Sequence, residues 1–292
     1  MDIRLSEGAA LSAAVFGDAS ANRFARPDVT RLLEHLDDGH TDAVVLDLDG
    51  TLRGSGRWLQ EGRALLELLR RRGTPFVILT NDASRFGHEK ARELRAAGAS
   101  VDDEHVITCA DLTVQTMRCR GWTSACVVGR LGSSNPSSVS LTPALADFAS
   151  RVMVLGSGTR LDDGLLSRWA AAPPQHCLVA NADLVWLPEA NTVSACPGLI
   201  ARALHSLSES LGQAVEFIEC GKPSVSAFSA AAQRLRELVG FTIANERIAV
   251  FGDSVHSDIE PARRCGMLAV EASFGLSQWK ASNATRSPRD SA

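Results

Sequence analysis

The chain has 292 residues, of which 45% are hydrophobic and 22% charged, a composition ordinary for a soluble globular protein with one large domain or two modest ones. Its formal net charge of −4 gives no support for nucleic-acid binding through bulk electrostatic attraction. No uninterrupted apolar run approaches the roughly 20 residues that cross a membrane. We therefore expect neither a nucleic-acid partner nor a membrane partner.

Seven cysteines are present, an odd number without any C-x-x-C pair. This pattern favours reduced thiols used in packing over a disulfide or zinc framework. The first twenty residues break a short apolar run with charge and lack a basic leader, which argues against a signal peptide. Both observations lead us to expect a cytoplasmic protein. The cysteines stand at positions 109, 119, 126, 177, 196, 220 and 265.

The first part of the chain is predicted to alternate strands and helices. The helix over about 60–72 is supported by Leu65, Leu68 and Leu69, which recur at helical spacing, and by Gly73, which can end it. In chain order we expect a short helix (27–36), a strand leading into AVVLDLDGTL (43–52), a helix (60–72), a strand (75–82) and two further helices (88–98 and 111–120).

The rest of the chain continues this alternation, which is typical of a parallel α/β sheet. A Ser/Pro-rich loop at 131–143 sets the middle of the chain apart, and apolar runs that end in polar residues return toward the C-terminus. We expect strand-like pieces at 125–129, 151–158 and 176–188, a helix at 197–212, a strand at 216–223, a long helix at 224–239 and a strand at 246–254.

The apolar runs of the two outer segments end in charged or hydrogen-bonding side chains. The carboxyl ends of parallel strands lie on one edge of a sheet, where ligands bind in open α/β folds. Four strand ends that carry carboxylates, a hydroxyl, an amide and an ammonium are better explained by one shared site than by four unrelated turns. The residues are Asp47 and Asp49, Thr80 and Asn81, Lys222, and Asp253.

The spacing of Asp47 and Asp49 raises its own question. Residues two apart on a strand share a side, so the two carboxylates are predicted to be neighbours that repel unless a proton, a cation or water compensates them. A solvated turn is the alternative, because Asp and Gly are favoured there.

Phosphoryl transfer is the chemistry that suits the whole set. Clustered carboxylates favour a hard cation such as Mg²⁺, while an ammonium, a hydroxyl and an amide can hold phosphate oxygens. One carboxylate can attack phosphorus, and the one two residues on can act as general acid and then as base.

Four segments resemble the motifs of haloacid-dehalogenase-superfamily phosphatases. They resemble most the class IIA branch of p-nitrophenyl, phosphoglycolate and pyridoxal phosphatases, which inserts a cap domain between the second and third motifs. Those motifs lie about 140 residues apart here, and NADLVWLP with CPG (181–188, 196–198) resembles a pattern within that cap. The four segments are DLDGT (47–51), TND (80–82), GKP (221–223) and GDSVHSDI (252–259).

The resemblance implies a fold and a division of the chain. The fold is a Rossmann-like parallel-sheet α/β core with an inserted α/β cap. The core is expected over 1–121 and 217–292 and the cap over 122–216, with a homodimer through the cap as one arrangement. The substrate is expected to be a small phosphorylated metabolite that the sequence does not name.

The resemblance also implies residue roles. Asp47 is the expected nucleophile and Asp49 the general acid and base. Thr80, Asn81 and Lys222 are expected at the phosphate, with Lys222 also stabilising charge during catalysis.

The metal roles come from the same resemblance. The expected cofactor is Mg²⁺, bound by the Asp47 carboxylate, the Asp49 carbonyl and Asp253, with Asp258 orienting metal-bound water or Lys222.

Three positions depart from the branch's usual pattern: Asp82 stands for Asn, His256 for Asp, and Ala182 for Pro. None of these changes removes a group expected to touch phosphate or metal.

The expected activity is a Mg²⁺-dependent phosphoric monoester hydrolase that works through an aspartyl-phosphate. A phosphomutase on the same core and a non-catalytic phospho-acceptor or phosphate-sensing module are the alternatives. Receiver-type switches lack the acid/base residue two positions after the nucleophile and need no inserted domain, which disfavours the last.

Overall fold

The computed structural model describes residues 27–54, 56–134, 138–143, 151–189 and 192–272. The chain forms two compact units. Unit 1 comprises Met1–Ile78 with Ala232–Ala292, and unit 2 comprises Leu79–Ala231. The boundaries fall inside one strand and one helix. The N-terminal segment expected to lack a signal peptide lies outside the described residues.

Unit 1 is built on a parallel sheet. Strands β14, β13, β1 and β4 are neighbours in that order, with Leu46 paired to Phe251 on one side and to Ile78 on the other. Every residue of β1 and β13 is buried, as expected for parallel strands covered on both faces. The strands are β1 (Ala43–Leu46), β4 (Phe76–Thr80), β13 (Ile248–Gly252) and β14 (Leu268–Glu271).

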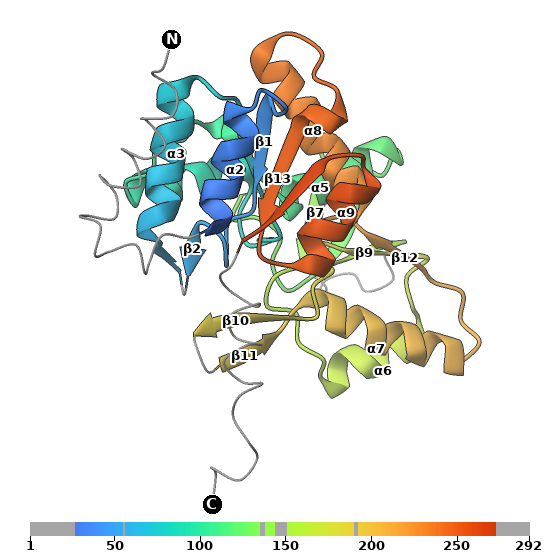
Figure 1. Cartoon of the computed structure of the whole chain (residues 1–292). Coiled ribbons are helices and arrows are strands. Elements are labelled where there is room, and N and C mark those ends of the chain that lie inside the picture. The colour runs from blue at the N-terminus through green and yellow to red at the C-terminus, as the bar shows by residue number, and fades with distance from the viewer. Residues whose placement is uncertain (1–26, 55, 135–137, 144–150, 190–191, 273–292) are drawn as a thin grey trace, which may run out of the picture. The chain divides into compact units, whose positions relative to one another are not determined.

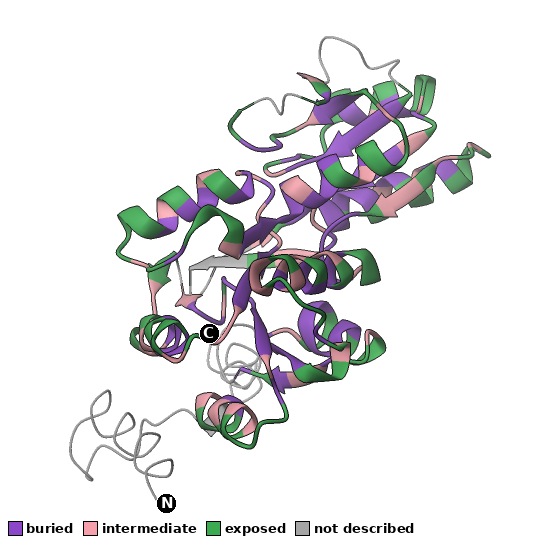
Figure 2. Cartoon of the chain, turned by 90° about the horizontal axis from the view of Figure 1, so that it is seen from above, coloured by how far each residue is buried: buried purple, intermediate pink, exposed green. Residues whose placement is uncertain are grey.

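The helices of unit 1 alternate with its strands along the sequence, and each amphipathic helix buries its apolar face. Helix α3 buries Leu65, Leu66, Leu68 and Leu69 and ends at Gly73, whose φ of 66° is a left-handed cap that favours glycine. Figure 2 shows the buried strands in purple and the outward helix faces in green. The elements are α2 (Pro27–Asp37), α3 (Gln60–Arg72), α8 (Val225–Val239, shared with unit 2), η3 (Asn245–Arg247), η4 (Val255–Ile259) and α9 (Glu260–Arg264), with the short hairpin β2 (Arg53–Gly54) and β3 (Arg57–Trp58).

Unit 2 contains a second parallel sheet, in the order β12-β9-β8-β6-β7. Its carboxyl edge carries the segment that follows β9, with Asp183, and the segment that follows β12, with Lys222. The strands are β6 (Ser124–Val128), β7 (Ser140–Pro143), β8 (Val152–Leu155), β9 (His176–Val179) and β12 (Glu216–Glu219).

The two faces of this second sheet feed two separate cores. Val152 and Val154 pack with residues of helix α5 on one face, while Met153 and Leu155 pack with helices α6 and α7 on the other. This alternation is the period of two that a strand imposes. Helices α6 and α7 lie beside each other in Figure 1. The helices are α5 (Cys109–Cys119), α6 (Asp163–Ala171) and α7 (Pro197–Ser210).

The packing of α5 explains why unit 2 begins well before residue 122. Cys109, Ala110, Val114 and Met117 belong to the same buried cluster as the second sheet. The compact unit is therefore larger than the expected cap of 122–216, and the cap as a functional domain stays a prediction. The remaining elements of unit 2 are α4 (Gly87–Ala96), η2 (Asp103–His105), β5 (Val106–Thr108), which neighbours β4, and the antiparallel hairpin β10 (Val185–Glu189) with β11 (Thr192–Ala195).

The predicted parallel α/β architecture is confirmed, and the 60–72 helix has the expected limits. Several details were wrong. The loop expected over 131–143 contains strand β7 at Ser140–Pro143, and the strand expected over 216–223 ends at Glu219. The stretch 176–188 is not one strand, because β9 ends at Val179 and β10 starts only at Val185. The helix expected from 111 starts at Cys109, because Thr108 caps it by accepting a hydrogen bond from the Asp111 N–H.

All seven cysteines are described and free, and five of them are buried. Burial raises the pKa of Cys109 well above the ordinary thiol value, so this thiol stays protonated and serves packing. In the part of the chain that the structure describes, no helix has the length and apolarity to span a bilayer.

Candidate active site

Adjacent strands of unit 1 place the first two aspartates of the site. Asp47 follows β1 and Asp253 follows β13, and these strands are paired in register. The Asp47 N–H donates to the Phe251 carbonyl at 2.9 Å. The hydrogen-bond ladder between β1 and β13 therefore continues one residue beyond β1 and fixes the backbone position of Asp47. The two carboxyl groups thus leave neighbouring strand ends at the same edge, as the sequence predicted.

Asp258 reaches the same place from the helical turn η4. The Ser254 N–H donates to Asp258 Oδ2 at 3.1 Å, and the Ser254 hydroxyl caps the turn by accepting from the Ser257 N–H, also at 3.1 Å. Gly252 makes room for this carboxyl group, since a Cβ there would lie 2.5 Å from Asp258 Cγ. A side chain at position 252 would push Asp258 away.

The loop after β1 also packs against Asp253. Gly50 has a φ of +98°, and a Cβ on it would lie 2.6 Å from Asp253 Oδ2. Thr51 donates its hydroxyl hydrogen toward Asp253 Oδ1 at 3.5 Å. The glycine and threonine of DLDGT therefore have a steric and a polar reason to stand where they do.

Asp47, Asp253 and Asp258 together form an acidic cluster. One carboxylate oxygen from each lies within 4.8 Å of the others, and the three residues are 5%, 6% and 1% exposed. Buried carboxylates this close repel one another unless a proton or a cation compensates them. Their all-oxygen donor set fits a hard divalent cation such as Mg²⁺.

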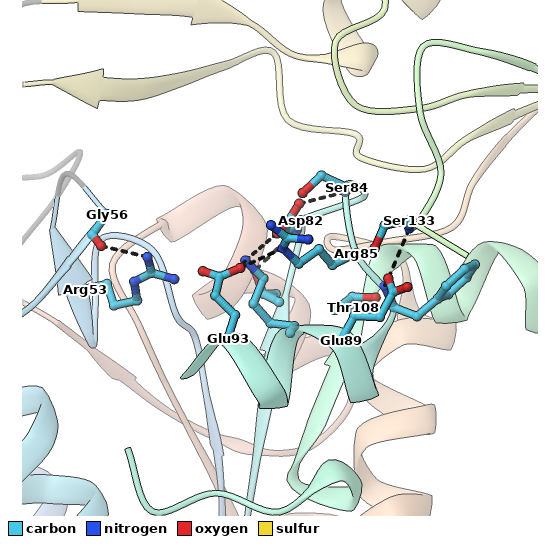
Figure 3. Close-up of polar contacts among 12 residues, drawn as sticks. Arg53, Gly56, Asp82, Ser84, Arg85, Glu89, Glu93, Thr108 and Ser133 are labelled. Carbon is cyan, nitrogen blue, oxygen red and sulfur yellow. Dashed lines mark hydrogen bonds and ion pairs between the residues drawn. The ribbon is translucent and has the colours of Figure 1, made fainter. Parts of the chain in front are cut away.

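Asp49 has a different setting from Asp47. It is exposed, while the intervening Leu48 is completely buried. Its backbone forms a bridge with Arg53, and the Gly50 N–H donates to the Arg53 carbonyl at 2.7 Å. The Arg53 guanidinium closes the hairpin by donating to the Gly56 carbonyl at 2.7 Å (Figure 3).

Unit 2 holds the expected phosphate-binding residues. The Lys222 N–H donates to Asn81 Oδ1 at 2.9 Å, and Asn81 Nδ2 donates both to the Lys222 carbonyl at 3.0 Å and to Asp183 Oδ2 at 2.8 Å. Both amide hydrogens of Asn81 are therefore engaged within the protein. The Asn81 side chain therefore holds the Lys222 backbone in place.

Close approach and burial fix this network. A Cβ on Gly221 would lie 2.5 Å from Asn81 Oδ1, so the glycine before Lys222 lets the two segments meet. Lys222 and Thr80 are each 3% exposed. Asp183 is itself oriented by its N–H, which donates to Asn181 Oδ1 at 2.8 Å.

Asn81 and Lys222 were predicted from the sequence, but the hydrogen bond by which Asp183 holds the Asn81 amide was not. The signal was present in NADL, although a contact between residues 102 apart cannot be read from either segment alone. Of the departures from the branch's pattern, His256 is exposed, Ala182 is buried, and Asp82 forms an ion pair with Lys90.

Two family models of related hydrolases match the chain, one in its first part and one near its C-terminal end. A model described as haloacid dehalogenase-like hydrolase matches residues 44–162, and one described as HAD-hydrolase-like matches residues 219–278. Together they cover more than half of the chain. No curated protein matched the sequence.

Several solved structures share the fold at low sequence identity. A possible sugar phosphatase of the HAD superfamily from Cytophaga hutchinsonii is 20% identical with a TM-score of 0.66, covering 85% of this chain and 90% of that one. A p-nitrophenyl phosphatase from Archaeoglobus fulgidus is 17% identical with a TM-score of 0.65, covering 85% and 94%. A glycerol phosphate phosphatase from Mycobacterium tuberculosis, solved with calcium, is 23% identical with a TM-score of 0.60, covering 78% and 65%.

These structures share the parallel α/β fold of this chain. The fold class expected from the sequence, a Rossmann-like core with an additional α/β sheet between the second and third motifs, is confirmed. The chain belongs to the haloacid-dehalogenase-like hydrolases.

Proposed function

We propose that the protein is a Mg²⁺-dependent phosphatase that hydrolyses a small phosphorylated metabolite through an aspartyl-phosphate on Asp47. The observation that carries the proposal is the buried cluster of Asp47, Asp253 and Asp258, whose carboxylates lie within 4.8 Å of one another. Phosphatase names among structures of the same fold support the reaction class.

Each unit contributes its own set of groups to this proposal. In unit 1, Asp47 directly follows Leu46 at the end of β1. In unit 2, Thr80 is the last residue of β4 and precedes Asn81. Asn81 then connects to Lys222 through the hydrogen bonds described above.

Two steps complete the reaction. In the first, an Asp47 carboxylate oxygen bonds to phosphorus, the bond from phosphorus to the leaving oxygen breaks, and Asp49 gives that oxygen a proton. In the second, Asp49 takes a proton from water, the water oxygen bonds to phosphorus, and the bond to Asp47 breaks to release phosphate. Asp47 and Asp49 return to their starting states.

Positive charge and hydrogen-bond donors stabilise the transferring group. Lys222 neutralises charge on the phosphoryl oxygens, and Thr80 and the Asn81 backbone supply hydrogen bonds to them. Asp47, Asp253 and the Asp49 carbonyl would hold Mg²⁺, with Asp258 orienting its remaining ligands. The cation supplies electrostatic stabilisation of the phosphoryl group.

Substrate choice is assigned to the inserted segment 122–216. The core groups act on the phosphoryl group, which all substrates share, so discrimination has to come from elsewhere. The partner is a small phosphorylated metabolite, and neither nucleic acid nor membrane takes part. We also propose a cytoplasmic location and retain a homodimer through the cap as the arrangement to test.

The direct test is phosphate release from p-nitrophenyl phosphate with Mg²⁺, with EDTA and with Mg²⁺ restored. We expect turnover only when Mg²⁺ is present, and loss of turnover in Asp47→Asn. Full activity in EDTA would overturn the metal role. A panel of sugar phosphates, glycerol phosphates and other phosphorylated metabolites then identifies the substrate class.

A further inference from the structure

A buried lysine in unit 2 contacts the phosphate-binding segment. Lys90 belongs to helix α4, and its side chain is only 7% exposed. Its Nζ lies 2.6 Å from Asp82 Oδ2 and 3.0 Å from Glu93 Oε2. Figure 3 shows Asp82, Glu93 and Arg85 gathered at this place. A lysine is rarely buried unless it is paired, so its environment requires an explanation.

Asp82 directly follows the residues assigned to phosphate binding. Its N–H donates to Thr80 Oγ1 at 3.2 Å, and its Oδ1 accepts from the Ser84 N–H at 2.7 Å. Asp82 thus stabilises the turn that follows Thr80, the last residue of β4, and that contains Asn81. A displacement of its carboxyl group would be transmitted to both neighbours.

The charge of Asp82 is unfavourable at this position. Burial raises the pKa of its carboxyl group, but the nearby Lys90 ammonium and the hydrogen bonds from Lys90 and Ser84 lower that pKa by more, so Asp82 is ionised. A fixed negative charge beside a phosphate site repels the phosphate, and low local dielectric makes the repulsion stronger. The expected asparagine at this position would carry no such charge.

The Lys90 ammonium is placed to neutralise the negative charge of Asp82. Glu93 also forms an ion pair with Arg85, whose Nε lies 2.8 Å from Glu93 Oε2. Glu93 therefore has a second cationic partner besides Lys90. The shortest contact of Lys90 is with Asp82. The arrangement along Asp82, Lys90, Glu93 and Arg85 alternates in sign and sums to zero charge.

We propose that Lys90 is a positioning residue of the phosphate site, which acts by cancelling the charge of Asp82 next to Thr80 and Asn81. The inference rests on the proposed phosphatase function. It assigns a role in phosphate affinity to a helical lysine outside the four motifs, and it explains how Asp82 is tolerated where asparagine is expected.

Lys90→Met and Asp82→Asn test the proposal because they should affect KM and Ki differently. Lys90→Met leaves the Asp82 charge uncompensated, and we expect the KM for p-nitrophenyl phosphate and the Ki for inorganic phosphate to rise by about tenfold, with a smaller change in kcat. Asp82→Asn leaves the cation, and we expect neither constant to rise. The double variant should return both constants to within about threefold of wild type.

Controls separate this role from a structural one. Lys90→Arg keeps the charge and should retain most phosphate affinity, while Glu93→Gln keeps the Asp82–Lys90 pair and should leave KM unchanged. A purely structural role would lower Tm in both single variants and shift their KM in the same direction. That result would overturn the inference.

The outcomes also distinguish this inference from the proposed function. If wild type turns over p-nitrophenyl phosphate but Lys90→Met and the double variant have its KM and Ki, only the role of Lys90 is refuted. If wild type itself neither hydrolyses the substrate nor binds inorganic phosphate, the phosphatase proposal fails and this inference fails with it. If Lys90→Met does not fold, the double variant and Asp82→Asn still decide, because a raised KM in either contradicts the charge argument.

Discussion

The acidic cluster of unit 1 and the charged row of unit 2 solve the problem of buried charge in different ways. In unit 1, Asp47, Asp253 and Asp258 bring three groups of one sign within 4.8 Å. In unit 2, Asp82, Lys90, Glu93 and Arg85 alternate in sign at contacts of 2.6 to 3.0 Å. The first arrangement is suited to an added cation, and the second is neutral by itself. Like charges gathered in a protein interior therefore indicate function more strongly than paired ones do.

The largest expected effect is the loss of the nucleophile from the acidic cluster. Asp47→Asn keeps the shape of the side chain but removes its ability to attack phosphorus, so turnover should fall to background. A pre-steady-state assay of p-nitrophenol release checks this, since no burst should remain. Substantial turnover in this variant would assign the attack to another group.

The metal prediction compares the two charged regions directly. Mg²⁺ at about 100 times its dissociation constant should raise the free energy of unfolding by about 2.7 kcal/mol if it binds only the folded protein. Asp253→Asn should reduce this increase, whereas Glu93→Gln in the self-neutral row should retain it. Thermal unfolding with and without Mg²⁺ gives the answer independently of activity. An equal Mg²⁺ effect in all three proteins would contradict the assigned site.

A smaller effect is expected at the support of Lys222. Asp183→Ala removes one acceptor of the Asn81 amide, which frees Asn81 to turn away from Lys222. We expect kcat/KM to fall by about tenfold, in line with loss of a hydrogen bond to a charged group. Asp183→Asn keeps an acceptor oxygen and is the matched control, with a smaller loss. Equal activity of both variants and wild type would show that Lys222 needs no such support.

The smallest effect concerns stability and pH at the start of α4. Burial raises the pKa of Glu89, but hydrogen bonds from the Phe86 backbone and from Ser134 and Ser133 lower it by more. The net result is a pKa of about 2, compared with the ordinary value of 4.5. Because the folded pKa is depressed, the stabilisation is complete above pH 4.5 and is lost as pH falls toward 2.

Glu89→Gln should accordingly destabilise the protein by about 1 kcal/mol at pH 7, since Glu89 caps the helix and is partly exposed to screening solvent. The difference from wild type should shrink as pH falls below 4.5. Urea unfolding at pH 7 and at pH 3.5 checks the trend. A difference that grew on acidification would have the wrong sign.

Much of the fold and part of the site were predictable because they depend on local patterns. Asp47 and Asp253 follow apolar runs that could only be buried strands, and parallel strands bring their ends together. The helix of 60–72 was predictable in both limits because its leucines repeat at helical spacing and Gly73 ends it.

The missed features depend on contacts between distant residues or on short turns. Lys90 reads as a surface lysine of an amphipathic helix, and only the folded chain places it against Asp82. The bond from Asn81 to Asp183 likewise joins residues 102 apart. The break between β9 and β10 was missed because NAD lies within an otherwise apolar stretch, where the Asx-type bond from the Asp183 N–H to Asn181 Oδ1 turns the chain.

The central claim, that Asp47 carries the phosphoryl group, is tested most directly by acid-quench mass spectrometry of Asp49→Asn. p-Nitrophenol leaves readily with little acid assistance, so this variant should still be phosphorylated. Without a base to activate water, which typically contributes about 10²–10⁴-fold, the intermediate should persist. The account predicts one added phosphoryl group on the peptide containing residues 43–52 in Asp49→Asn, and none in Asp47→Asn. A phosphoryl group trapped by Asp47→Asn, or found on another peptide, would contradict it.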